Sequence, residues 1–102
     1  MLIATWENWL DQHIPHYELA KQRKRYADNP PEAVLIVSPV DRNHRINQRP
    51  GFEWSTWETM DTEIRDLGYQ AEPVFLDSDT YQRWYWAFWS HSEALMAVIR
   101  LS

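Results

Sequence analysis

The 102-residue sequence contains no cysteine. This excludes disulfide bonds and thiolate nucleophiles, and any zinc site would need histidine and carboxylate ligands alone. The sequence also lacks an apolar run near the roughly 20 residues that cross a bilayer, and residues 1–7 do not have the basic and then apolar layout of a signal peptide. We therefore predict a cytoplasmic protein that is stabilised by packing.

Glycine and basic residues are also scarce. The chain has two glycines, so proline marks most of its turns, and its net charge is −5. An acidic balance of this size argues against general nucleic-acid binding. Basic residues gather in two stretches, residues 21–25 and 42–49, which leaves a nucleic-acid-associated role open as an alternative.

Aromatic residues, in contrast, are abundant, with seven tryptophans, five tyrosines and three phenylalanines. Each large ring can bury about 150 to 250 Å². A chain of this length has limited interior volume, and aromatic residues are enriched in the cores of interfaces. We therefore expect some of these rings to lie at a surface.

The pattern of apolar residues predicts a single α+β domain over residues 1–102. We expect two N-terminal helical segments, the first capped by Thr5 and the second opened or kinked at Pro15. Residues 33–37 are apolar throughout, which predicts a central strand buried on both faces. Further elements are predicted as a helix from the Ser55–Glu58 capping box to Gly68, strands at residues 73–76 and 82–89, and a helix after Ser90. This last helix is expected to point Ala94, Leu95, Val98 and Ile99 inward.

This order predicts a three-stranded mixed sheet with the sequence β-α-β-β-α and the two N-terminal helical segments packed against it. The first two strands would be parallel, and the third would return antiparallel as a hairpin. The arrangement resembles part of a split β-α-β sandwich. A helix over residues 80–101 is the alternative, but the capping box Ser90–Glu93 favours a strand followed by a new helix.

The segment from Trp84 to Trp89 is the leading candidate for an interaction surface. Alternation places Trp84 and Trp86 on one face, and Tyr85 and Trp89 on the other. A three-stranded sheet with helices on one face would leave the second face open. We therefore predict that these four side chains form a homodimer interface.

Two charged surfaces are weaker candidates. Glu58, Asp61 and Asp66 are predicted to form an acidic docking face for a basic partner, because complementary charge speeds encounter and selects partners. The polar loop around residues 41–52 could bind a phosphate or carboxylate. Its candidate anion-binding residues are Arg42, His44, Arg45 and Arg49.

Two further patterns suggest chemistry. His13 and His16 could chelate a metal with a third ligand such as Asp11, His44 or His91, but Pro15 interrupts the helical spacing. Residues 74–80, an apolar strand followed by Asp-Ser-Asp-Thr, resemble the nucleophile loop of haloacid-dehalogenase-type phosphotransferases, which implies an aspartate nucleophile and Mg²⁺. We prefer a carboxylate-rich turn here, and we predict no metal site, cofactor or catalytic residue.

The sequence therefore predicts a small acidic interaction protein without enzymatic activity, which forms a homodimer and binds or inhibits a macromolecular partner. Accessory proteins of phages and mobile elements are often of this type. One alternative is a small-molecule-binding domain or minor enzyme with an aromatic pocket around Trp84, Trp86 and His91, in which His44 or Asp77 could also act as the polar group. The other is a nucleic-acid-associated factor that uses residues 21–25 and 42–49.

Overall fold

The computed structural model describes residues 1–37, 57–76 and 83–101. Its strands form one antiparallel sheet with the order β1-β2-β4-β3. The strands are β1 (Leu2–Thr5), β2 (Ala33–Val37), β3 (Ala71–Val74) and β4 (Trp84–Phe88). The helices of the described ranges are α1 (Trp6–Gln12), α2 (His16–Arg25), α4 (Trp57–Asp66) and α5 (His91–Leu101).

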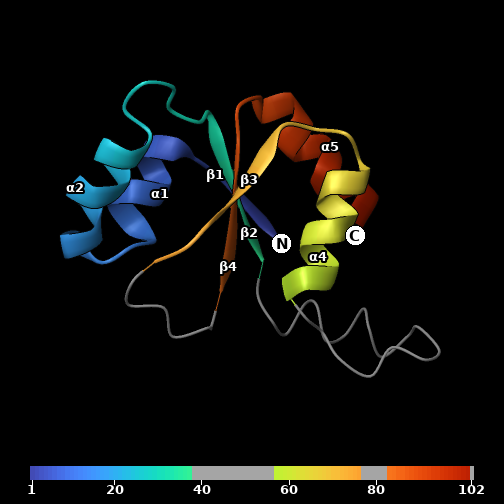
Figure 1. The fold of residues 1–102 in the computed structure, drawn as a ribbon, viewed down its shortest axis with the longest axis horizontal. Helices are drawn as coiled ribbons and strands as arrows, with labels where there is room; N and C mark the ends of the chain where they lie inside the picture. The colour runs from blue at the N-terminus through green and yellow to red at the C-terminus, as the bar shows by residue number, and fades with distance from the viewer. Residues whose placement is uncertain (38–56, 77–82, 102) are drawn as a thin grey trace.

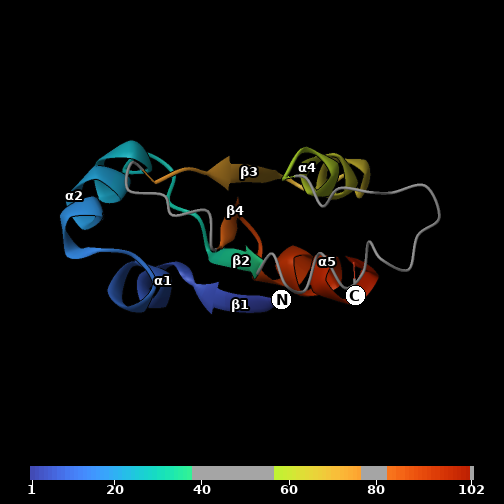
Figure 2. The same cartoon turned by 90° about the horizontal axis from the view of Figure 1, so that it is seen from below.

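The elements form three layers. Figure 1 views the sheet along its edge, with α1 and α2 on one side and α4 and α5 on the other. Seen from below, the strands follow one another from β3 to β1 between the same two pairs of helices (Figure 2). Each face of the sheet is therefore covered by helices of the same chain.

The alternation of side chains along β2 and β4 divides the interior into two clusters. Leu35 and Trp86 point toward α4 and α5, whereas Val34 and Tyr85 point toward α1 and α2. All residues of β2 are buried, as the uninterrupted apolar run predicts. The alternation predicted for β4 is also confirmed, so residues 84–88 form a strand and not a helix.

The α+β class is confirmed, but the predicted sheet of three mixed strands is wrong. The structure has a fourth strand, β1, and β4 lies between β2 and β3 and is antiparallel to both. The strands β2 and β3 run in the same direction but share no ladder, so the β2-α4-β3 unit is split by β4. The antiparallel pairing of β3 with β4 agrees with the prediction.

The unpredicted strand β1 has four residues and pairs with β2 along its whole length. Thr5 ends this strand and also caps α1, because its Oγ1 accepts a hydrogen bond from the Asn8 amide at 3.3 Å. The sequence signal of the cap is therefore correct. The strand before the cap was not predicted, because four residues are too few to show a clear alternation.

Three other predicted helix boundaries are confirmed. Pro15 precedes the first residue of α2, and Gly68 follows α4 with a φ of 80°, a left-handed conformation that glycine adopts without steric cost. The Ser90 hydroxyl accepts a hydrogen bond from the Glu93 amide at 3.4 Å and caps α5. The capping box of residues 55–58 lies outside the residues whose side chains the structure describes.

The strand predicted at residues 73–76 lies two residues earlier, at residues 71–74. Pro73 is inside this strand, and β3 is an edge strand with β4 as its ladder neighbour. A proline has no amide hydrogen to donate, so edge strands tolerate it. Phe75, which the prediction placed in the strand, follows it and is 53% exposed.

Candidate interaction surface

The aromatic strand β4 is mostly inside the molecule. Trp86 and Tyr85 are buried on opposite faces, whereas Trp84 and Trp89 are partly buried. The face that we expected to be open is covered by α1 and α2 (Figure 1). The reason for placing a homodimer interface on this strand is therefore wrong, because one chain supplies the cover for both faces.

Asp61 ties α4 to the sheet. The indole Nε1 of Trp86 donates a hydrogen bond to Asp61 Oδ1 at 3.0 Å, and Arg65 Nε donates to Asp61 Oδ2 at 2.8 Å. The Asp61 hydrogen bond is also the main cause that raises the pKa of Arg65. Of the predicted acidic docking face, Asp61 is turned inward and Asp66 is exposed, and the side chain of Glu58 is not described.

On the opposite face of the sheet, aromatic rings contact one another in a chain. Their contacts are Trp6 stacked on Trp9, Trp6 edge-on to Tyr26, Trp9 edge-on to Tyr85, and Tyr26 tilted against Trp89, with centroid distances of 5.2 to 6.1 Å. Trp89 Nε1 also donates to the Asn29 carbonyl at 2.8 Å. These contacts fix α1 and the end of α2 on the sheet.

The same layer buries polar side chains of α2. Glu18 and Gln22 are both buried, and Gln22 Nε2 donates to the Phe75 carbonyl at 3.4 Å. The Tyr26 hydroxyl, one turn further, is buried without a hydrogen-bond partner within the described ranges. Burial is the main cause that raises the pKa of Tyr26, since it disfavours the phenolate.

The inner side of α2 carries Glu18 and Gln22 in place of apolar residues. Tyr17, Ala20 and Lys24, which share the helical spacing, are all exposed.

The aromatic pocket that the alternative function requires is not formed from the predicted residues. Trp84 is the first residue of β4 and His91 begins α5 beyond the other end of that strand. A strand rises about 3.3 Å per residue, so the length of β4 separates them. Trp86 between them is fully buried and bound to Asp61. His44 and Asp77 lie outside the described residues.

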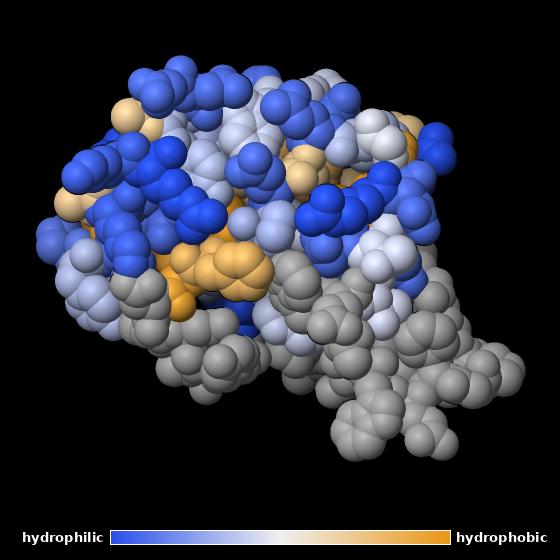
Figure 3. Space-filling model, viewed as in Figure 1, coloured by the Kyte–Doolittle hydropathy of each residue, from blue (hydrophilic) through white to orange (hydrophobic). Residues whose placement is uncertain are grey.

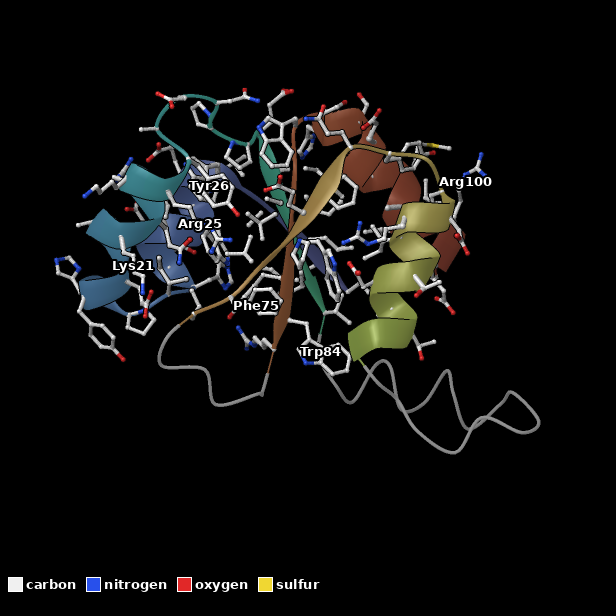
Figure 4. The ribbon with its side chains drawn as sticks, viewed as in Figure 1. Lys21, Arg25, Tyr26, Phe75, Trp84 and Arg100 are labelled. Atoms are coloured by element: carbon white, nitrogen blue, oxygen red, sulfur yellow. The ribbon has the colours of Figure 1, made fainter. Side chains whose placement is uncertain are left out.

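The basic side chains of residues 21–25 are exposed on α2, whereas Gln22 within this stretch is buried. The Arg23 guanidinium donates two hydrogen bonds to the Glu7 carboxylate, at 2.9 and 3.2 Å. These hydrogen bonds lower the pKa of Glu7. Lys21 and Arg25 lie on the side of α2 that faces Phe75 (Figure 4). In the same view, strongly hydrophilic side chains adjoin an apolar area (Figure 3). The loop with Arg42, His44, Arg45 and Arg49 is outside the described residues.

No group of three or more metal-ligating side chains occurs in residues 1–37, 57–76 and 83–101. Desolvation lowers the pKa of His13, and the charge of Arg83 acts in the same direction.

Within residues 1–37, 57–76 and 83–101, no helix has the length and apolar character needed to cross a membrane.

The orientation of α5 differs more from the predicted packing than that of any other described helix. We expected Ala94, Leu95, Val98 and Ile99 to point inward. Ala94 is buried and Val98 is partly buried against the core, as expected, and Ala97 and Leu101 are buried as well. Leu95 is 47%, Met96 40% and Ile99 68% exposed, so the expectation is wrong for Leu95 and Ile99. Ile99 lies four positions after Leu95 and three after Met96, so it is a neighbour of both on the helix surface. We name these three side chains the α5 outer face.

Comparison with known proteins identified no relative of this chain. No protein-family model matches the chain, and no curated protein or solved structure is significantly similar to it.

Proposed function

We propose that this chain is a non-enzymatic interaction protein that forms a homodimer through the α5 outer face and binds or inhibits a macromolecular partner. The observation that carries this proposal is the exposure of Leu95, Met96 and Ile99 on a helix whose alanines are buried. Single exposed apolar residues are ordinary on protein surfaces, but contiguous large ones mark interaction sites. Leucine, methionine and isoleucine on one helix face would be desolvated by a facing helix.

The proposal differs from the prediction in the surface it uses. On β4, Tyr85 and Trp86 are buried by the chain itself, so they would contribute no new buried area on association. The α5 outer face would contribute such area, at about 25 cal/mol per Å² of apolar surface removed from water. The homodimer therefore has stronger support on α5 than on the aromatic strand.

The partner of such a dimer would be basic. The chain has a net charge of −5, and Asp66 is exposed on α4. Charge of one sign steers a partner of the opposite sign and raises the association rate. A partner of this kind would bind more slowly as the salt concentration rises.

Sedimentation velocity across a dilution series tests the dimer. We expect the unmodified chain to sediment as a dimer at high concentration, and Ile99→Lys to weaken the dimer at least tenfold, because the charge would be desolvated at the interface. Tyr17→Lys is the matched control, since Tyr17 is 71% exposed on α2, in the other helical layer. A chain that is monomeric at every concentration, or a dimer that Ile99→Lys leaves intact, would refute the α5 interface.

A second candidate function is anion or nucleic-acid binding at the edge of β3. Its support is the position of Lys21 and Arg25 on the side of α2 that faces the exposed ring of Phe75 (Figure 4). Cations bind phosphates, and an exposed aromatic ring can stack on a base. Salt-dependent retention on a single-stranded DNA column that is lost in Phe75→Ala and in Lys21→Ala/Arg25→Ala would support this function. Retention that neither variant changes would contradict it.

A further inference from the structure

We infer that two copies of α5 pair antiparallel about a two-fold axis beside Met96, with Glu93 of each copy paired with Arg100 of the other. This inference rests on the proposed homodimer. It specifies the orientation, the register and the ion pairs of the interface.

The helix carries two opposite charges at equal distances from the centre of its exposed apolar residues. Glu93 is in the first turn and Arg100 is in the last. Their midpoint along the chain falls beside Met96, as does the centre of the α5 outer face. Arg100 points away from the sheet in Figure 4. Seven residues, or about 10.5 Å of helix, separate the two charged positions.

The two charges also lie on the same flank of the exposed surface. With about 3.6 residues per turn, positions 93, 96 and 100 follow one another along one side of the helix, whereas positions 95 and 99 lie on the other side of Met96. A two-fold axis reverses the direction of the second helix and keeps its flank on the same side. Glu93 of one copy therefore meets the partner's Arg100, twice in each dimer.

A parallel arrangement would not form these ion pairs. Its two-fold axis runs along the helices and places the charged flanks of the two copies on opposite sides of the interface, so Glu93 does not meet the partner's Arg100. The charge pattern of α5 is thus complementary to itself in the antiparallel orientation alone. This self-complementarity is the reason for choosing a second copy of the chain as the occupant of the α5 outer face.

The expected affinity follows from the size of the surface. An interface confined to one helix of 11 residues is expected to be smaller than the roughly 800 Å² per partner of a standard interface. We therefore expect a dissociation constant on the order of micromolar, and the experiments should span about 0.1 to 100 μM.

Disulfide cross-linking tests the register directly, because the chain has no cysteine of its own. Met96→Cys lies next to the predicted axis and should form a disulfide-linked dimer under mild oxidation. Ser92→Cys, which is also exposed on α5, would be about 13 Å from its copy along the helix pair and should not cross-link. A parallel pair would cross-link at both positions.

Charge reversal tests the ion pairs. Glu93→Arg and Arg100→Glu should each weaken the dimer about fivefold to tenfold, and the double variant should recover most of the loss. The Glu93 amide that Ser90 caps belongs to the backbone, so the cap survives both substitutions, which far-UV circular dichroism can verify. Variants that weaken the dimer without mutual rescue would overturn the reciprocal pairing.

The outcomes separate the inference from the proposed function. If the unmodified chain dimerises but Ser92→Cys cross-links, or Met96→Cys does not, the antiparallel pairing is wrong and the homodimer stands. If the unmodified chain stays monomeric over the whole range, or binds only a different protein through α5, both the homodimer and this inference fail.

Discussion

The two helical layers of this protein cover the same sheet in opposite ways. The layer of α1 and α2 buries the large rings of Trp6 and Trp9 and also buries the polar side chains of Glu18 and Gln22. The layer of α4 and α5 has an apolar interior, yet α5 buries Ala94, Ala97 and Leu101 and exposes Leu95, Met96 and Ile99. One layer encloses polar groups, and the other exposes apolar ones.

This difference shows that hydropathy alone does not decide which side of a helix packs. On α5, buried alanines leave room for the large side chains of β2 and β4, such as Trp86 and Phe88, because protein interiors fill their space closely. On α2, Gln22 can be buried because it donates to the Phe75 carbonyl. Four sets of substitutions test this comparison, from the largest expected effect to the smallest.

Trp86→Ala should cause the largest loss of stability. Trp86 is fully buried in the layer of α4 and α5 and donates a hydrogen bond to Asp61, so the substitution leaves a cavity and removes the link to α4. We expect the free energy of unfolding in urea to fall by about 3 to 5 kcal/mol. Trp84→Ala, at a partly buried position of the same strand, should cost less. Equal losses would mean that Trp86 is not packed more completely than Trp84 on this face of β4.

Ala97→Leu and Leu95→Ala test the orientation of α5. Ala97 is fully buried, so a leucine there should overpack the core and lower the free energy of unfolding by about 1 to 3 kcal/mol. Leu95→Ala should change it by less than about 0.5 kcal/mol, when measured at concentrations where the chain is monomeric. The reverse order would show that the large residues of α5 face inward, as the sequence pattern predicted.

Tyr26→Phe tests the cost of polar burial in the layer of α1 and α2. The Tyr26 hydroxyl has no hydrogen-bond partner within the described ranges, so its removal should leave stability at pH 7 unchanged or raise it by less than about 1 kcal/mol. Burial raises the pKa of Tyr26 above its ordinary 10.0. The folded protein therefore retains this proton where the unfolded chain releases it, and stability falls as pH rises above 10.

Tyr26→Phe removes the ionisable hydroxyl, so the free energy of unfolding of this variant should fall less steeply above pH 10. Urea unfolding of both proteins between about pH 9 and pH 11 measures the difference. A loss of more than about 1 kcal/mol at pH 7 would indicate that the hydroxyl is hydrogen-bonded.

Glu7→Gln should have the smallest effect. The hydrogen bond with Arg23 lowers the pKa of Glu7 below its ordinary 4.5, so the pair stabilises the fold above that pH, and the contribution is lost as pH falls through the lowered value. Both side chains are exposed, and we expect less than about 1 kcal/mol in low salt and almost nothing in high salt. Chemical denaturation at both salt concentrations measures this, with Asp66→Asn as the control. A loss that salt does not reduce would contradict a screened surface pair.

Much of the fold follows from local sequence signals. The caps at Thr5 and Ser90, the glycine after α4, the buried strand β2 and the alternation in β4 are short-range features, and each is present in the structure. The strand order was not predictable in this way. It depends on β1 and on the insertion of β4 between β2 and β3, which are long-range pairings that local patterns do not encode.

The candidate surface was predictable only in part. The sequence indicates that this chain has more large apolar side chains than a small interior holds, but it placed the excess on β4. A strand with aromatic residues on both faces can be covered by two helical layers, and this requires the position of α1 and α2. The exposed residues of α5 could not be identified because Ala94, Leu95, Val98 and Ile99 also form a regular helical stripe.

Methionine oxidation tests the central claim most directly, because two of the three methionines, Met60 and Met96, lie in opposite environments. Met60 is fully buried in the core, and Met96 is 40% exposed at the centre of the α5 outer face. If α5 forms the dimer, limited peroxide treatment should oxidise Met96 rapidly in dilute protein and slowly in concentrated protein, while Met60 stays protected throughout. A Met96 oxidation rate that is the same at every protein concentration would contradict the account.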